Sequence, residues 1–173
     1  MVVIHSIPSP MKTLTLLVAL ALLPLAAKAA PTITDYFLRI PHQGFTEGTP
    51  QQLVQIMQRG EGRGLIDTKN GYFRMEGDGA QVSLQGALFR HEDKSPLLVV
   101  AWGNLEVPDF THLTIFKEVN GKMVVANRKI FPVADSDTLR FELPRHGRTV
   151  IVRNAAGKEV SRWTWVKDSF VQE

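Results

Sequence analysis

The chain has 173 residues, with 20 Lys and Arg against 17 Asp and Glu, and it contains no cysteine. Lys12 and Lys28 precede all the carboxylates, so residues 30–173 carry 18 positive and 17 negative groups and no run of Lys or Arg, which argues against nucleic-acid binding. The absence of cysteine excludes disulfides, thiol nucleophiles and thiolate metal sites.

Residues 1–29 have the parts of a secretory signal peptide. Lys12 precedes an apolar run over Leu14–Ala27, and Ala27-Lys28-Ala29 is an A-x-A site with cleavage before Ala30. Residues 1–10 fit no part of this pattern, so either translation starts at Met11 or the positive region is unusually long. The run is too short to cross about 30 Å of hydrocarbon comfortably. We therefore expect a periplasmic or secreted protein with no membrane anchor after cleavage.

Residues 30–173 form a chain long enough for a single β-rich domain with its own core. One helix is predicted at about residues 50–58, because Thr49 is an N-cap residue and Pro50 suits the first helical position. Leu53, Ile56 and Met57 give it a narrow apolar stripe that must pack on a sheet. The earlier apolar cluster at 36–40 predicts a first strand or a single helical turn.

Short apolar runs separated by turn residues follow Gly64. Asn120-Gly121 is the strongest hairpin signal, and Gly86 predicts a bulge or a close crossing. Around Gly86, Leu84 shares one face with Leu88, and Gln85 lies on the opposite face with Ser83. The run over 97–102 is apolar on both faces, as in a central strand covered on both sides. Strands are expected at 65–66, 72–76, 82–89, 97–102, 111–119, 122–130, 139–143, 150–152, 159–166 and 170–171.

This pattern predicts an all-β fold: an antiparallel β-sandwich or partly open barrel of hairpins with one short N-terminal helix. The chain also resembles a group of uncharacterised exported bacterial all-β proteins with no established activity. The resemblance rests on GLIDTKNGYFRMEG, ALFR, LLVVAWG, LTIFKEVNGK, FELPRHG and RWTWV. It implies export and an all-β domain, and it assigns no functional residue.

No catalytic, metal or cofactor site is predicted. The histidines His42, His91, His112 and His146 do not form a zinc-type pair. Neither Ser83 nor Ser95 lies in a nucleophile elbow, although a triad assembled from distant residues needs no local motif. The carboxylates that a glycosidase would need lie in or beside turns, where such residues are ordinarily solvated: Glu76, Asp78, Glu106 and Asp109.

Three tryptophans are the candidate binding residues. Trp163 and Trp165 point to the same face of a strand, where two indoles form a platform for a sugar or a peptide. Their alternative role is to complete the core with Phe170, which the large apolar area of an indole favours. Trp102 is the third candidate.

Five arginines in the C-terminal hairpins could form a basic face: Arg140, Arg145, Arg148, Arg153 and Arg162. Glu142, Glu159 and Asp168 are interleaved with them, which favours a solvated face of mixed charge.

We therefore expect an exported, non-catalytic β-domain that binds an unidentified partner protein or envelope component. The alternative is a small envelope hydrolase that uses loop histidines and carboxylates, and a third hypothesis is a purely structural role. A hydrolase should bring a histidine within hydrogen-bond reach of a carboxylate in a cleft. A binding domain should expose an apolar or aromatic patch.

Overall fold

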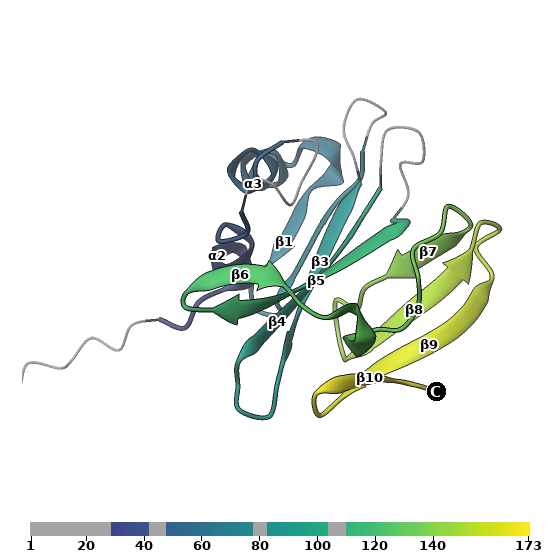
Figure 1. Cartoon of the computed structure of the whole chain (residues 1–173). Coiled ribbons are helices and arrows are strands. Elements are labelled where there is room, and N and C mark those ends of the chain that lie inside the picture. The colour runs from purple at the N-terminus through teal and green to yellow at the C-terminus, as the bar shows by residue number, and fades with distance from the viewer. Residues whose placement is uncertain (1–28, 42–47, 78–82, 104–109) are drawn as a thin grey trace, which may run out of the picture. The chain divides into compact units, whose positions relative to one another are not determined.

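The computed structural model describes residues 29–41, 48–77, 83–103 and 110–173, and residues 31–173 form one compact unit (Figure 1). The predicted signal peptide lies outside the described residues except for Ala29, as do His42, Asp78, Glu106 and Asp109.

In the described residues, ten antiparallel strands form two sheets. Each sheet is a meander in chain order (Figure 1). The first sheet has six strands: β1 (Leu65–Asp67), β2 (Tyr72–Met75), β3 (Leu84–Arg90), β4 (Pro96–Trp102), β5 (His112–Val119) and β6 (Lys122–Val125). The second has four: β7 (Leu139–Glu142), β8 (Thr149–Asn154), β9 (Glu159–Val166) and β10 (Ser169–Gln172). The all-β prediction is confirmed. Of the two predicted architectures, the structure has the antiparallel β-sandwich, because the strands form two separate sheets.

The predicted helix is present as α3 (Pro50–Gln58), whose N-terminus is closed by a capping box. The Thr49 hydroxyl accepts from the Gln52 amide at 3.2 Å, and the Gln52 side chain accepts from the Thr49 amide at 2.9 Å. The cluster near residue 36 is helical rather than extended: α2 (Ile33–Phe37) starts at a second capping box, between Thr32 and Asp35. None of the helices in the described residues is long and apolar enough to cross a membrane.

The six-stranded sheet is covered on both faces, which confirms the prediction for residues 97–102. Leu98 and Val100 of β4 are buried with residues of α2 and α3, whereas Leu97, Val99 and Ala101 are buried with residues of the four-stranded sheet. Because β4 alternates between two cores, it needs apolar side chains at successive positions. The β6 hairpin is confirmed too, with Asn120 at φ 51° and Gly121 at φ 77° between Val119 and Lys122.

The expected strand at 122–130 is wrong in its second half. β6 ends at Val125, and a short 3₁₀ helix, η5 (Arg128–Ile130), follows it. The Asn127 side chain accepts a hydrogen bond from the Lys129 amide at 2.9 Å, which turns the chain out of the sheet.

A buried glutamine links the two sheets. Gln85 is buried on the β3 face that meets the four-stranded sheet, where its amide group donates to the Phe141 carbonyl and accepts from the Leu143 amide at 3.2 Å. The Phe141 amide donates to the Phe110 carbonyl at 2.9 Å. The prediction that Gln85 lies on the face of β3 opposite Leu84 is confirmed, and that face is part of a second core.

Gly86 marks a close crossing, one of its two predicted alternatives. It lies opposite Phe73 on β2, and a Cβ at Gly86 would come within 2.3 Å of Phe73 Cζ. The Phe73 ring cannot move freely, because it is buried and packs edge-on against Phe37 with centroids 4.8 Å apart.

We expect Gly86→Ala to lower the free energy of unfolding by about 1–3 kcal/mol, the usual cost of overpacking a core. Phe73→Leu removes the ring atoms that the new methyl group meets, so the same substitution should cost less in that background. Urea unfolding of the four proteins of this cycle measures the coupling. An equal cost in both backgrounds would contradict the role given to the Phe73 ring.

Candidate functional site

Two grooves meet at one end of the sandwich. The first, called here the β7–β8 groove, has a volume of about 490 Å³ and lies between β2 and the turn that joins β7 to β8. Leu143 and Ile151 form apolar parts of its walls. Its charged lining consists of four arginines and one carboxylate: Arg74, Arg145, Arg148, Arg162 and Glu142.

The second, called here the β9–β10 groove, has a volume of about 700 Å³ and lies between the β3–β4 turn and the β9–β10 turn. Its charged lining is again mostly basic: Arg90, Lys94, Arg148 and Lys167, with Glu92 as the carboxylate. Val166 supplies exposed apolar surface, and the nearly buried Trp165 contributes to the floor. The two grooves share Arg148, so we call them together the basic end.

An ion pair between the sheets positions the β7–β8 turn. Arg145 Nε lies 2.7 Å from Asp67 Oδ2, and the Asn70 side chain and amide also donate to the Asp67 carboxylate, at 2.8 and 3.2 Å. The hydrogen bond from the Asn70 side chain, followed by that from Arg145, lowers the pKa of Asp67 from 3.8 to about 2. The turn that carries Arg148 is therefore held to the six-stranded sheet by a carboxylate that stays ionised.

A second inter-sheet contact positions the β9–β10 turn. His91 Nδ1 lies 2.7 Å from Asp168 Oδ1, and the His91 ring meets the Trp165 indole edge-on with centroids 5.2 Å apart. Trp165 Nε1 donates to the Arg90 carbonyl at 2.9 Å. These contacts hold the basic residues of the β3–β4 turn beside those of the β9–β10 turn.

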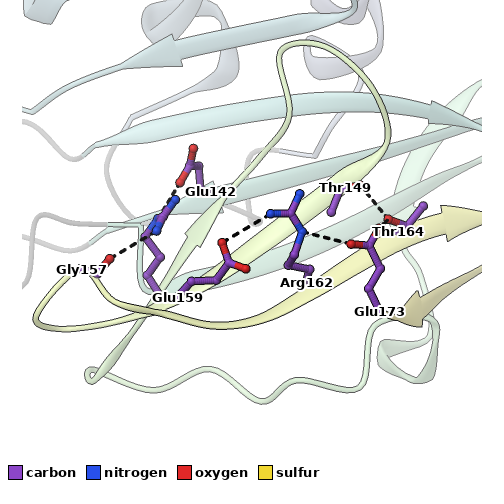
Figure 2. Close-up of polar contacts among 8 residues, drawn as sticks. Glu142, Thr149, Gly157, Glu159, Arg162, Thr164 and Glu173 are labelled. Carbon is purple, nitrogen blue, oxygen red and sulfur yellow. Dashed lines mark hydrogen bonds and ion pairs between the residues drawn. The ribbon is translucent and has the colours of Figure 1, made fainter.

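Carboxylates pair with the arginines on the outer face of the four-stranded sheet. Figure 2 shows Arg162 between Glu159 and Glu173, at 3.5 and 3.0 Å, and Glu173 also accepts from the Thr164 hydroxyl. That hydroxyl, and then Arg162, lower the pKa of Glu173. Arg153 Nε lies 2.8 Å from Glu142. The contacts agree with a mixed-charge interpretation for this part of the sheet.

Arg148 differs from these arginines. It is exposed, and among the described residues its side chain has no hydrogen bond or ion pair. Its backbone carbonyl accepts from the Trp165 amide at 2.9 Å, which fixes the main chain at this position. The Arg148 guanidinium therefore lies where the two grooves meet, on a main chain held by a hydrogen bond. No ion-pair partner among the described residues compensates its charge.

The three candidate tryptophans lie in different surroundings. Trp165 is 1% exposed and packs on Phe170 with ring centroids 5.0 Å apart, so it takes part in the core and contributes only to the floor of the β9–β10 groove. Trp163 is half-buried against Phe131 at 5.5 Å. Trp102 is half-buried on the other sheet and stacks on His112 at 4.5 Å. A ligand role for these residues stays a prediction.

The histidines divide in a similar way. His91 is within hydrogen-bond reach of a carboxylate in a groove, whereas His112 Nδ1 lies 3.8 Å from Asp135 and His146 lines the β7–β8 groove. Ser83 accepts from the Gly77 amide, and Ser95 donates to Asp93, so both hydroxyls have structural partners. In the part of the chain that the structure describes, no three His, Asp or Glu side chains are grouped to hold a metal ion.

Sequence reasoning named Arg148 only as one of several arginines in the C-terminal hairpins. It missed the basic end because Arg90 and Lys94 come from the other sheet, more than fifty residues away in the chain. The turn residues between apolar runs were the available signal, since turns at the same end of an antiparallel meander lie close together.

Comparison with known proteins adds information on the fold alone. No family model and no curated protein matches the chain. Among solved structures, the chain is similar to a domain of an uncharacterized protein from Porphyromonas gingivalis W83, with a TM-score of 0.53 and 13% sequence identity. The similarity covers 83% of this chain and 99% of that domain.

The low pKa of Asp67 predicts a pH-dependent contribution to stability. Because this pKa is about 2 in the folded protein and 3.8 ordinarily, the contribution is present above about pH 4 and is lost as the pH falls toward 2. Asp67→Asn should therefore lower the urea unfolding midpoint most above pH 5, and progressively less toward pH 2.

Asp137→Asn provides the matched control, because the Asp137 carboxylate is exposed and has no partner among the described residues. The decrease in the urea unfolding midpoint caused by Asp67→Asn should become smaller at low pH. Any change in the midpoint caused by Asp137→Asn should depend less on pH. A difference from wild type that stays constant between pH 7 and pH 2 would contradict this role for Asp67.

Proposed function

We propose that the protein is an exported, non-catalytic β-domain that binds a partner protein or a component of the cell envelope. The observation that carries this proposal is the pair of grooves that meet at Arg148. The two grooves have volumes of about 490 and 700 Å³, and basic residues outnumber acidic residues in the lining of each. A concave surface with a few charged groups and apolar walls suits the capture of a ligand.

The arrangement of side chains favours binding over catalysis. A nucleophilic mechanism needs a nucleophile, a base and an orienting group in contact. Thr164 is the one hydroxyl-bearing residue in the lining of the β9–β10 groove, and its side chain is bonded to Thr149 and Glu173. Among the described residues that line this groove, no side-chain nucleophile is therefore available to the His91–Asp168 pair.

The same pair is the observation that favours the alternative function, a small envelope hydrolase. A histidine oriented by a carboxylate 2.7 Å away is able to activate water as a general base. Both functions therefore use the same end of the sandwich, and a substitution at His91 distinguishes them.

The experiment uses the full-length chain expressed in a Gram-negative host, followed by recovery of its exported form. We expect the N-terminus of that form to be Ala30. We also expect it to sediment with isolated envelope fragments, and to release no soluble product from them by mass spectrometry. His91→Gln, which keeps a hydrogen-bond donor near Asp168, should likewise release no soluble product.

Two outcomes contradict the proposal. Release of envelope products by the wild-type protein, with loss of that release in His91→Gln, would show the hydrolase instead. A protein that stays in the cytoplasm with an intact N-terminus, and that does not sediment with envelope fragments, would remove both export and envelope binding.

A further inference from the structure

We propose that the basic end binds an acidic polymer of the envelope, with a carboxylate or phosphate group of the polymer bound by Arg148. This inference rests on the proposed function and specifies the chemical class of its ligand. It assigns Arg148 as the residue that contacts the ligand, and it places the chain of the polymer along the two grooves that meet there.

The first argument is the difference between Arg148 and the neighbouring arginines. Arg145 is paired with Asp67 at 2.7 Å, and Arg162 is paired with two glutamates. These pairs hold each guanidinium in place and compensate its charge. Arg148 has no such partner among the described residues, so its five N–H donors are available to a ligand.

The second argument is the charge on either side of Arg148. In the β9–β10 groove, Lys94 and Lys167 are exposed and make no ion pair among the described residues. In the β7–β8 groove, Arg74 contacts Glu76 through one nitrogen at 3.0 Å, whereas its buried Nε–H has no hydrogen-bond partner within the described ranges. Basic groups therefore extend in both directions from Arg148, which suits a ligand with repeated negative charges.

The third argument is the chemistry of the groups involved. A guanidinium offers a planar fork that matches the two oxygens of a carboxylate or a phosphate. Ile151 is half-buried in the lining of one groove and Val166 is exposed in the lining of the other, so the uncharged part of the repeating unit contacts apolar surface between the charged groups. Two open grooves joined at one residue fit a chain better than a compact ion.

The experiment is a calorimetric titration of the exported form with four soluble polymers at low and physiological salt. Polygalacturonate carries carboxylates, polyphosphate carries phosphates, dextran is neutral, and poly-L-glutamate represents an acidic protein. We expect one of the first two to bind most tightly, dextran not to bind, and binding to weaken as salt rises. The polymer that binds identifies the charged group.

Arg148→Gln should raise the Kd for that polymer about tenfold or more, as expected for the loss of a charge-assisted contact. Arg148→Lys keeps the positive charge but lacks the planar guanidinium fork, so its Kd should lie between those of the wild-type protein and Arg148→Gln. Lys158→Gln is the control with the same change in net charge, because Lys158 is exposed in the β8–β9 turn and lines neither groove. Its Kd should stay within about twofold of wild type.

Three results would overturn the inference. Equal weakening by Arg148→Gln and Lys158→Gln would show an effect of net charge alone. Tighter binding of poly-L-glutamate than of the other polymers would indicate an acidic protein as the ligand. Absence of binding to every polymer, together with sedimentation of the protein with envelope fragments, would refute the ligand class and leave the proposed function intact. Conversely, polymer binding by a protein that is not exported would refute the proposed function alone.

Discussion

The position of β7 against the six-stranded sheet depends on a polar contact inside the core, made by the side-chain amide of Gln85. Strand β7 is an edge strand whose backbone groups face the six-stranded sheet, and burial of such groups without partners would cost about 1–3 kcal/mol each. One glutamine provides both a donor and an acceptor for them, at Phe141 and Leu143. Because the β7–β8 turn begins directly after Leu143, this contact also fixes where the turn that carries Arg148 begins.

The fold was predictable because its signals are local. The alternation of apolar residues, the Asn120-Gly121 turn and the doubly apolar run of β4 each depend on neighbours within a few positions. The error at residues 122–130 has a local cause too, because the Asn127 side chain ends β6 early. For residues 36–40, the Thr32–Asp35 capping box decides between the two predicted alternatives in favour of the helical turn. Burial of Gln85 required knowledge of which strand lies opposite it, which no periodicity provides.

The candidate site was not predictable to the same degree, because it consists of turns from both sheets. Arg148 has the same sequence context as other arginines in the C-terminal hairpins, and what distinguishes it is that no carboxylate among the described residues forms an ion pair with it. The aromatic signal indicated Trp165, which is a core residue in the structure. A large aromatic side chain in a strand usually indicates a buried position. No pattern in the sequence indicates which of several exposed charged side chains lacks an ion-pair partner.

The most direct test of this account is amide hydrogen exchange at Leu143, measured by NMR in the wild-type protein and in Gln85→Leu. The Leu143 amide donates to the Gln85 side chain at 3.2 Å, so we expect slow exchange in the wild-type protein and much faster exchange in the variant. Amides in the centre of β4 should change far less. If Leu143 exchanges equally fast in both proteins, Gln85 does not hold β7 and the positioning of the basic end needs another explanation.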